Sequence, residues 1–165
     1  MLDLLPCALV VAALALATDL ADRTIPNALT LPAVVLGLVA QCVVHGPGGL
    51  VIGLLGVLIG AGLLLGPFVA GFMGAGDVKL MAALGALLGP LGALAVVLIA
   101  SLTAGCLAVT TAAHLGQLRQ AWRGASHLVR PPGERRVESI GSLPFAVPIA
   151  VGVALVEPFL AALAR

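Results

Sequence analysis

The chain has 165 residues, of which 61% are hydrophobic and 9% are charged, and its formal net charge is +1. A soluble domain carries roughly 25% charged residues, so this chain has too little polar surface to cover itself in water. The near-neutral charge argues against nucleic acid as a partner. We expect one membrane-embedded domain over residues 1–165, with the lipid bilayer as its solvent.

Six apolar segments alternate with polar or glycine- and proline-rich breaks. A membrane core about 30 Å thick needs roughly 20 apolar residues in a helix, so the pattern predicts an all-α polytopic membrane protein with about six transmembrane helices. The predicted spans are Leu4–Thr18, Ala28–Val44, Leu50–Ala70, Val78–Leu88, Leu91–Ala113 and Leu143–Leu163. The fourth is short, because Val78 to Leu88 rises only about 16 Å.

Gly53, Gly56, Gly60 and Gly62 recur in the third predicted span at helix-packing intervals. Small residues let helices approach closely in lipid. We therefore expect this span to pack against a neighbour through these four glycines.

The Gly89-Pro90 pair decides how the apolar block from Val78 to Ala113 is divided. A turn at this pair places seven of the eight basic residues on one side of the membrane. The positive-inside rule makes that side cytoplasmic, and both termini then face away from it. A single kinked helix would instead export a loop with five arginines, which argues against that alternative.

Residues 114–142 form the longest polar stretch and are predicted to be a cytoplasmic loop with an amphipathic helix. The apolar residues that recur there at helical spacing are Leu115, Leu118, Trp122, Ala125 and Val129. Such a helix would lie on the cytoplasmic lipid surface. A docking surface for a partner is the alternative interpretation.

Two aspartates stand where apolar segments end or begin. Asp19 directly follows the first apolar run, and Asp77 precedes the fourth, after Gly74-Ala75-Gly76. A carboxylate at membrane depth is energetically expensive and by default indicates a functional site. Two neighbouring carboxylates can share a proton, so that one acts as base and the other as acid while water attacks a peptide carbonyl. Gly74 and Gly76 would permit unusual backbone geometry and the close approach of a substrate strand.

The residues around both aspartates resemble the active-site motifs of type IV prepilin peptidases. Asp19-Leu-Ala-Asp-Arg-Thr-Ile-Pro-Asn27 and the Leu-Thr-Leu-Pro that follows it resemble the first motif, an aspartate six residues before I/L-P-N/D. Gly74-Ala-Gly-Asp77-Val-Lys79-Leu resembles the second motif, G-x-G-D-x-K-L. Leu143-Pro-Phe-Ala-Val-Pro148 is similar to the opening of the family's last span.

This resemblance implies a GxGD-type aspartyl endopeptidase, a hydrolase of the bacterial inner membrane that serves type IV pili or protein secretion. It would cut the leader peptide of prepilins or pseudopilins at the cytoplasmic membrane face. By motif position, Asp19 and Asp77 would be catalytic. The supporting residues would be Gly74, Gly76, Lys79, Pro26 and Asn27. Lys79 would tune the charge of the aspartate pair or help to seat the substrate, and a headgroup anchor is the alternative. Asp22 departs from the motif and is expected to be a solvated loop residue.

The chain also departs from the larger members of that family, which carry an N-terminal zinc domain with four cysteines and methylate the new N-terminus. Cys7, Cys42 and Cys106 are scattered and cannot form that site, so we expect neither a cofactor nor a metal. The chain resembles the short, peptidase-only form associated with tight-adherence pili. The alternative functions are a small transporter or proton or cation channel that uses Asp19 and Asp77, and a non-catalytic assembly factor.

Overall fold

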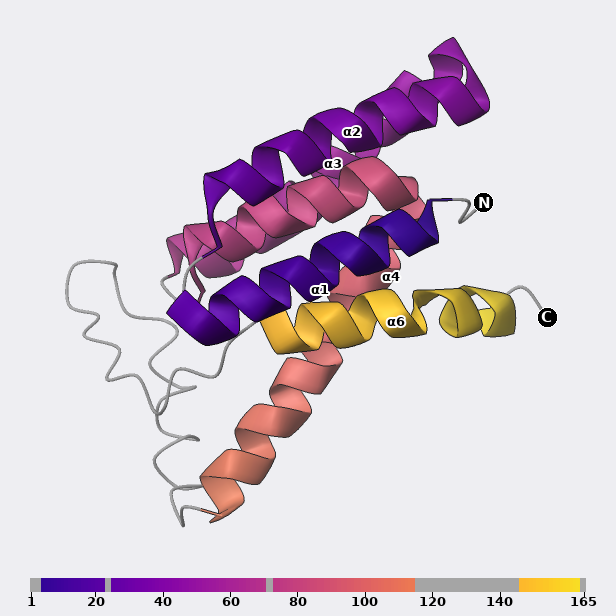
Figure 1. The fold of residues 1–165 in the computed structure, drawn as a ribbon. Coiled ribbons are helices and arrows are strands. Elements are labelled where there is room, and N and C mark those ends of the chain that lie inside the picture. Colours follow the sequence, from indigo (N-terminus) through magenta and orange to yellow (C-terminus); the bar gives the residue numbers. More distant parts are fainter. Residues whose placement is uncertain (1–3, 23–24, 71–72, 115–145, 164–165) are drawn as a thin grey trace.

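The computed structural model describes residues 4–22, 25–70, 73–114 and 146–163, which form a bundle of helices (Figure 1). The helices are α1 (Leu5–Asp22), α2 (Asn27–His45), α3 (Pro47–Val69), α4 (Ala75–His114) and α6 (Ala146–Leu163). Within these residues α2, α3, α6 and the Ala75–Thr111 part of α4 are long and apolar enough to cross a membrane, whereas the apolar α1 is shorter. The prediction of an all-α polytopic membrane protein is confirmed.

Helix α4 consists of two arms that meet at Gly89. The backbone of Gly89 has φ 69° and ψ −175°, which is outside the helical region. Pro90 has no backbone N–H, so the helical hydrogen-bond ladder cannot continue across this point. Figure 1 shows the first arm (residues 75–88) and the second arm (residues 90–114) running in different directions, so that both ends of α4 lie on the same side. The Gly89-Pro90 pair therefore makes the predicted turn.

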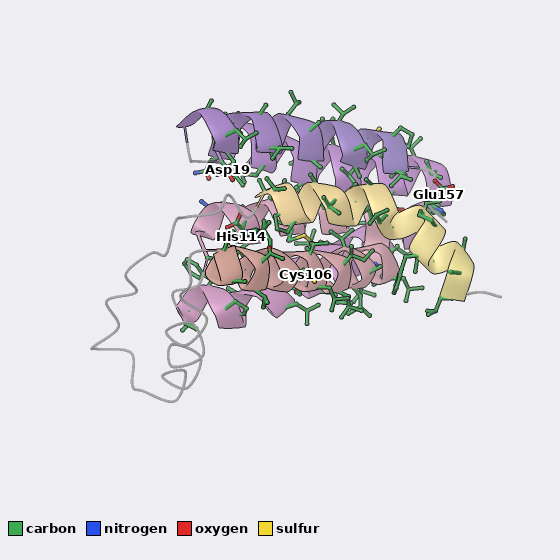
Figure 2. All side chains as sticks on the ribbon, turned by 90° about the horizontal axis from the view of Figure 1, so that it is seen from below. Asp19, Cys106, His114 and Glu157 are labelled. Atoms are coloured by element: carbon green, nitrogen blue, oxygen red, sulfur yellow. The ribbon has the colours of Figure 1, made fainter. Side chains whose placement is uncertain are left out.

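The ends of the bundle differ in what they carry. Asp19, near the end of α1, and His114, at the end of α4, lie at one end of the bundle, whereas Glu157 of α6 lies toward the other (Figure 2). The start of α1 and the end of α6 both lie at that second end (Figure 1). The first and last helices therefore begin and end, respectively, at the same end of the bundle, as six spans of alternating direction require.

The first arm of α4 lies at the centre of the packing. Helices α1, α2, α3 and α6 all contact α4, and the side chains of Leu80, Met81 and Leu84 are fully buried. A buried side chain of this size contributes roughly 1.5–3 kcal/mol in water, but in lipid the close packing of helices matters more. The position of Asp77, at the beginning of this arm, is thus fixed by the best-packed part of the chain.

Glycines bring α3 against the first arm of α4 at backbone distance. A Cβ atom on Gly56 would collide with the carbonyl of Gly85, and one on Gly60 would collide with the carbonyl of Met81. Gly53 packs on Leu38 of α2. The packing role predicted for these three glycines is confirmed, but it is wrong for Gly62, which has nothing within 4 Å of a Cβ position because it lies on the exposed side of α3.

A buried glutamine supports the turn in α4. Gln41 of α2 is 4% exposed, and its Nε2 atom donates a hydrogen bond of 2.8 Å to the carbonyl of Leu87. Carbonyls in the last turn of a helix have no partner within the helix. Gln41 therefore satisfies one of the carbonyls that the break at Gly89 leaves open.

Two predicted boundaries are wrong in a way that bears on the site. Helix α1 continues through Asp22 instead of ending at Thr18, so Asp22 is the last helical residue and does not lie in a loop. Helix α4 begins at Ala75 instead of Val78. Both Asp19 and Asp77 are consequently held within helical turns. The predicted loop over residues 114–142 lies, apart from His114, outside the described residues, as does the Leu143–Phe145 part of the last motif.

Candidate active site

Asp77 closes the N-terminal cap of α4. Its carboxylate oxygen Oδ2 accepts a hydrogen bond of 3.2 Å from the N–H of Gly74, and its own N–H donates one of 3.2 Å to the carbonyl of Gly74. Such a reciprocal pair satisfies backbone groups that the first turn of a helix leaves without partners. The Asp77 residue is 8% exposed. Its geometry is therefore set by the cap, and the lining around it excludes most solvent.

Asp19 lies in the last turn of α1 and is half-buried. Its carboxylate interacts electrostatically with that of Asp77. Helix α1 contacts both α4 and α6, and the interaction between the two carboxylates places the end of α1 near the start of α4. The structure thus brings together the two aspartates that the sequence singled out.

The residues before α2 contact the start of α4 through Gly76. A Cβ atom on Gly76 would lie 3.1 Å from the Cβ of Ile25, which is tighter than ordinary van der Waals contact. A Cβ on Gly74 would meet nothing closer than Oδ2 of Asp77, at 3.7 Å. Among the described residues, positive φ occurs at Gly46 and Gly89, so neither glycine of the motif is required for its φ. The close approach of Ile25 explains why position 76 is a glycine. This approach was not evident from the sequence alone.

The two motifs are also joined by a polar contact. Asn27 is the first residue of α2, and its Oδ1 accepts a hydrogen bond of 2.8 Å from Nζ of Lys79. Pro26 occupies the N-cap position with an extended backbone, φ −70° and ψ 142°. Its carbonyl accepts hydrogen bonds from the N–H groups of Leu29 and Thr30. Pro26 therefore sets the direction in which α2 leaves the site, and Lys79 fixes that start to α4.

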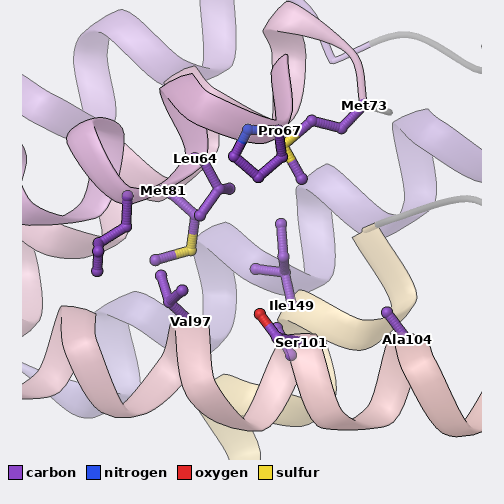
Figure 3. Close-up of a pocket in the computed structure, with 10 residues that line it drawn as sticks. Leu64, Pro67, Met73, Met81, Val97, Ser101, Ala104 and Ile149 are labelled. Carbon is purple, nitrogen blue, oxygen red and sulfur yellow. The ribbon is translucent and has the colours of Figure 1, made fainter. Parts of the chain in front are cut away.

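An apolar cavity of about 230 Å³ lies next to this cluster (Figure 3). Two methionines of its wall, Met73 and Met81, stand four residues before and four residues after Asp77. The other lining residues come from α3, the second arm of α4 and α6: Leu63, Leu64, Pro67, Val97, Ala100, Ser101, Ala104 and Ile149. The sequence alone did not predict this cavity. No pattern in a single sequence indicates it, because its lining residues come from segments that lie far apart in the chain.

The arrangement suits acid–base chemistry by a carboxylate pair. Two interacting carboxylates hold protons as a unit, so that one can accept a proton from water while the other donates one. The described residues contain no group of three histidine, cysteine, aspartate or glutamate side chains that could hold a metal ion. A pair of carboxylates can support the attack of water on a carbonyl carbon, with one group as base and the other as acid.

Comparison with known families gives an independent assignment. Residues 5–109 match the type IV leader peptidase family, and this range includes both aspartates, Asn27, Lys79 and most of α4. Comparison with curated proteins and with solved structures found no match. The family match covers more than half of the chain, and it makes the protein a peptidase with a peptide substrate, embedded in the membrane by its apolar helices. The chain belongs to the type IV leader peptidase family.

Proposed function

We propose that the chain is an aspartyl endopeptidase of the bacterial inner membrane that removes the leader peptide of prepilins or pseudopilins, with Asp19 and Asp77 as its catalytic pair. The observation that carries this proposal is the meeting of the two carboxylates at one end of the bundle, where they interact electrostatically. They come from separate motifs on α1 and α4, and both lie within the family match. A carboxylate pair of this kind is the minimal machinery for hydrolysis of an amide bond without a covalent intermediate.

In the proposed reaction, the ionised member of the pair takes a proton from a water molecule. The water oxygen then attacks the carbonyl carbon of the scissile bond, while the protonated member donates a hydrogen bond to the carbonyl oxygen. The tetrahedral intermediate collapses as the carbon–nitrogen bond breaks, and the leaving amine takes up the proton that the first carboxylate received from water. The pair returns to its singly protonated state. The buried cap around Asp77 holds its carboxylate in place and limits competing access of bulk water.

The proposed function includes a direction for the substrate across the bundle. Asp19 and Asp77 lie at the end of the bundle that also carries Lys79, and the positive-inside rule makes this the cytoplasmic end. A prepilin with a polar leader and an apolar segment would place the leader at this end and the apolar segment among the lipids. The scissile bond between them would then lie beside the carboxylate pair.

Co-expression with a prepilin tests the proposal. The wild-type chain is expected to shorten the prepilin by its leader, as seen on a gel and by mass spectrometry of the new N-terminus. Asp19→Asn and Asp77→Asn are expected to leave the leader attached. A transporter or channel that uses the same carboxylates would leave the prepilin intact in all cases, and cleavage by Asp19→Asn would contradict the catalytic pair.

A further inference from the structure

The apolar cavity is elongated along the helices that line it. On the second arm of α4 its lining runs from Val97 through Ser101 to Ala104 (Figure 3), which is a rise of about 10 Å along a helix. On α3 the lining runs from Leu63 to Pro67, a rise of about 6 Å. The hydrocarbon core of a bilayer is about 30 Å thick. The cavity therefore extends over at most about two thirds of the depth of one leaflet.

The cavity has a closed side and an open side. Met81 and Ile149 are fully buried and close its inner side. Leu63 of α3 and Ser101 of α4 are exposed where these two helices border the cavity. Leu98, one turn before Ser101 and on the same face of the arm, is 48% exposed. The open side is thus continuous with the apolar surface that α3 and α4 present to the bilayer.

The lining favours hydrocarbon over water or a polar ligand. Nine of the ten lining residues are apolar, Ser101 is the exception, and none is charged. An apolar cavity of about 150 Å³ stays free of water and can hold benzene, and this one has about 230 Å³. Met73 and Met81 have flexible side chains that adapt to irregular apolar shapes. A narrow, flexible hydrocarbon chain fits both the length and the lining of the cavity.

We propose that the cavity binds one acyl chain of a bilayer lipid, which enters between α3 and the second arm of α4. In a membrane this chain is the apolar group present at the open side, and it restores the dispersion contacts that an empty cavity would lack. The bound chain also contacts Met73. Met73 directly precedes Gly74, whose backbone N–H and carbonyl hold Asp77 in its cap. The lipid therefore supports the segment that positions the Asp77 carboxylate.

Photolabelling in vesicles tests this site. The purified full chain is reconstituted in phosphatidylcholine that contains a small share of phosphatidylcholines with a diazirine at different positions along one acyl chain. After irradiation, mass spectrometry locates the adducts. Met73 and Val97 are half-buried, yet we expect them to be labelled at least as strongly as Leu65 and Leu102, which are 48% and 69% exposed. Labelling of the exposed leucines without labelling of Met73 or Val97 would overturn the proposal.

Variants that fill the cavity separate a bound chain from lipids that surround the bundle. Ala104→Phe places a ring at the rim of the cavity and is expected to lower the adducts on Met73 and Val97 about tenfold, while those on Leu102 remain. Ser101→Leu fills the same side and serves as a second variant. Unchanged labelling of Met73 and Val97 in both variants would overturn the cavity as the binding site.

Ala108→Phe is the matched control. Ala108 is exposed, lies one turn beyond Ala104 on the same arm and is not part of the lining, so the variant is expected to keep the wild-type labelling. The same loss of adducts in Ala108→Phe as in Ala104→Phe would show that the ring acts elsewhere on the arm, and would overturn the assignment to the cavity.

The apolar segment of a prepilin is the competing occupant. In the Asp77→Asn variant, which is expected to bind a prepilin without cleaving it, excess prepilin should leave the lipid adducts on Met73 and Val97 in place. Loss of these adducts would assign the cavity to the substrate and overturn the lipid site. The other measurements use no prepilin, so their outcome is independent of the proposed peptidase activity.

Discussion

Lys79 donates a hydrogen bond of 2.8 Å from its Nζ atom to Oδ1 of Asn27, and this bond joins the start of α4 to the start of α2. Each residue belongs to a different motif, and each motif contains one of the two aspartates. Lys79 is exposed, and its amino group is directed to a neutral amide in this structure. The contact favours a positioning role for Lys79 over the charge-tuning and headgroup-anchoring roles that the sequence also allows.

Removal of this bond is expected to slow cleavage without abolishing it. A hydrogen bond between a charged and a neutral group is worth about 1.5–3 kcal/mol in general, and exposure to solvent reduces this figure. Lys79→Met and Asn27→Leu should therefore each lower the cleavage rate about three- to tenfold. Asn27→Asp should retain activity, because a carboxylate oxygen can accept the same bond. Initial rates of leader removal in membranes provide the measurement.

The double variant Lys79→Met with Asn27→Leu separates the possible roles. If Lys79 acts through Asn27, the double variant should be no slower than either single variant, because both remove the same bond. If the rate losses of the two single variants multiply in the double variant, Lys79 contacts the substrate or the aspartates independently of Asn27.

Asparagine in place of either aspartate is expected to abolish leader removal while the protein stays folded and inserted. The amide has the size of the carboxyl group but cannot exchange a proton with its partner. At Asp77 the amide oxygen can still accept the hydrogen bond from Gly74, so the cap of α4 is preserved. Cleavage below about one thousandth of the wild-type rate, with unchanged membrane content and thermal unfolding, is the expected result for both variants.

Two other acidic residues supply controls for this experiment. Asp22→Asn makes the same substitution three residues after Asp19, and Glu157→Gln removes a carboxylate near the opposite end of the bundle (Figure 2). Both variants should cleave at close to the wild-type rate. A large loss in Asp22→Asn together with an active Asp19→Asn would move the catalytic role to Asp22.

The sequence predicted the helical segments and their order because apolar runs of membrane length are distinctive. The turn at Gly89-Pro90 was also predictable, since proline lacks the N–H that the helix needs. The helix ends were not: hydropathy falls at Asp19 and rises after Asp77, yet both residues are helical because backbone hydrogen bonds, and not hydropathy, decide where a helix ends. Hydropathy therefore located the aspartates outside the helices that hold them.

The site was only partly predictable. Spacing within each motif drew attention to Asp19 and Asp77, but contacts between motifs depend on how α1, α2 and α4 pack. The bond between Lys79 and Asn27, the contact between Ile25 and Gly76, and the apolar cavity are all of this second kind. None of them leaves a periodic signal in a single sequence.

Alanine at Gly76 is expected to harm activity more than alanine at Gly74. The new methyl group at Gly76 would lie 3.1 Å from the Cβ of Ile25, so the start of α4 or the segment before α2 must move by a few tenths of an ångström. Displacement of catalytic groups by 1 Å costs about 100-fold in rate, and a smaller shift should cost several-fold. Gly74→Ala meets an ordinary contact at 3.7 Å and serves as the matched control. Equal losses for both variants in the cleavage assay would point to substrate contact instead.

Cleavage is expected to continue in the presence of strong chelators. The proposed reaction uses two carboxylates and water, and no step of it passes through a metal ion. Purified protein in detergent, treated with EDTA and then with 1,10-phenanthroline, should retain its full rate. A loss of activity that added zinc reverses would count against the carboxylate mechanism.

Three glycines allow a graded test of the turn between the arms of α4. Gly89 has a φ of 69°, and a Cβ there would also lie 3.0 Å from Cγ2 of Ile52. Gly46 has a φ of 67° but nothing within 4 Å, and Gly62 has neither a positive φ nor a close neighbour. At both Gly46 and Gly89 a positive φ is combined with a ψ near 180°, a conformation that costs a residue with a Cβ about 1–3 kcal/mol. Gly46→Ala should therefore lower the free energy of unfolding by about this amount.

Gly89→Ala should cost more than Gly46→Ala, because the methyl group must also displace Ile52 at the point where Gln41 supports the turn. Gly62→Ala should be neutral or stabilising by up to about 1 kcal/mol, since alanine is the better helix residue. Thermal unfolding of the three variants in one detergent, followed by circular dichroism, measures the order. Equal unfolding temperatures for Gly89→Ala and Gly62→Ala would show that the two arms of α4 can join without a positive φ at position 89. The turn would then not be a fixed feature of the fold.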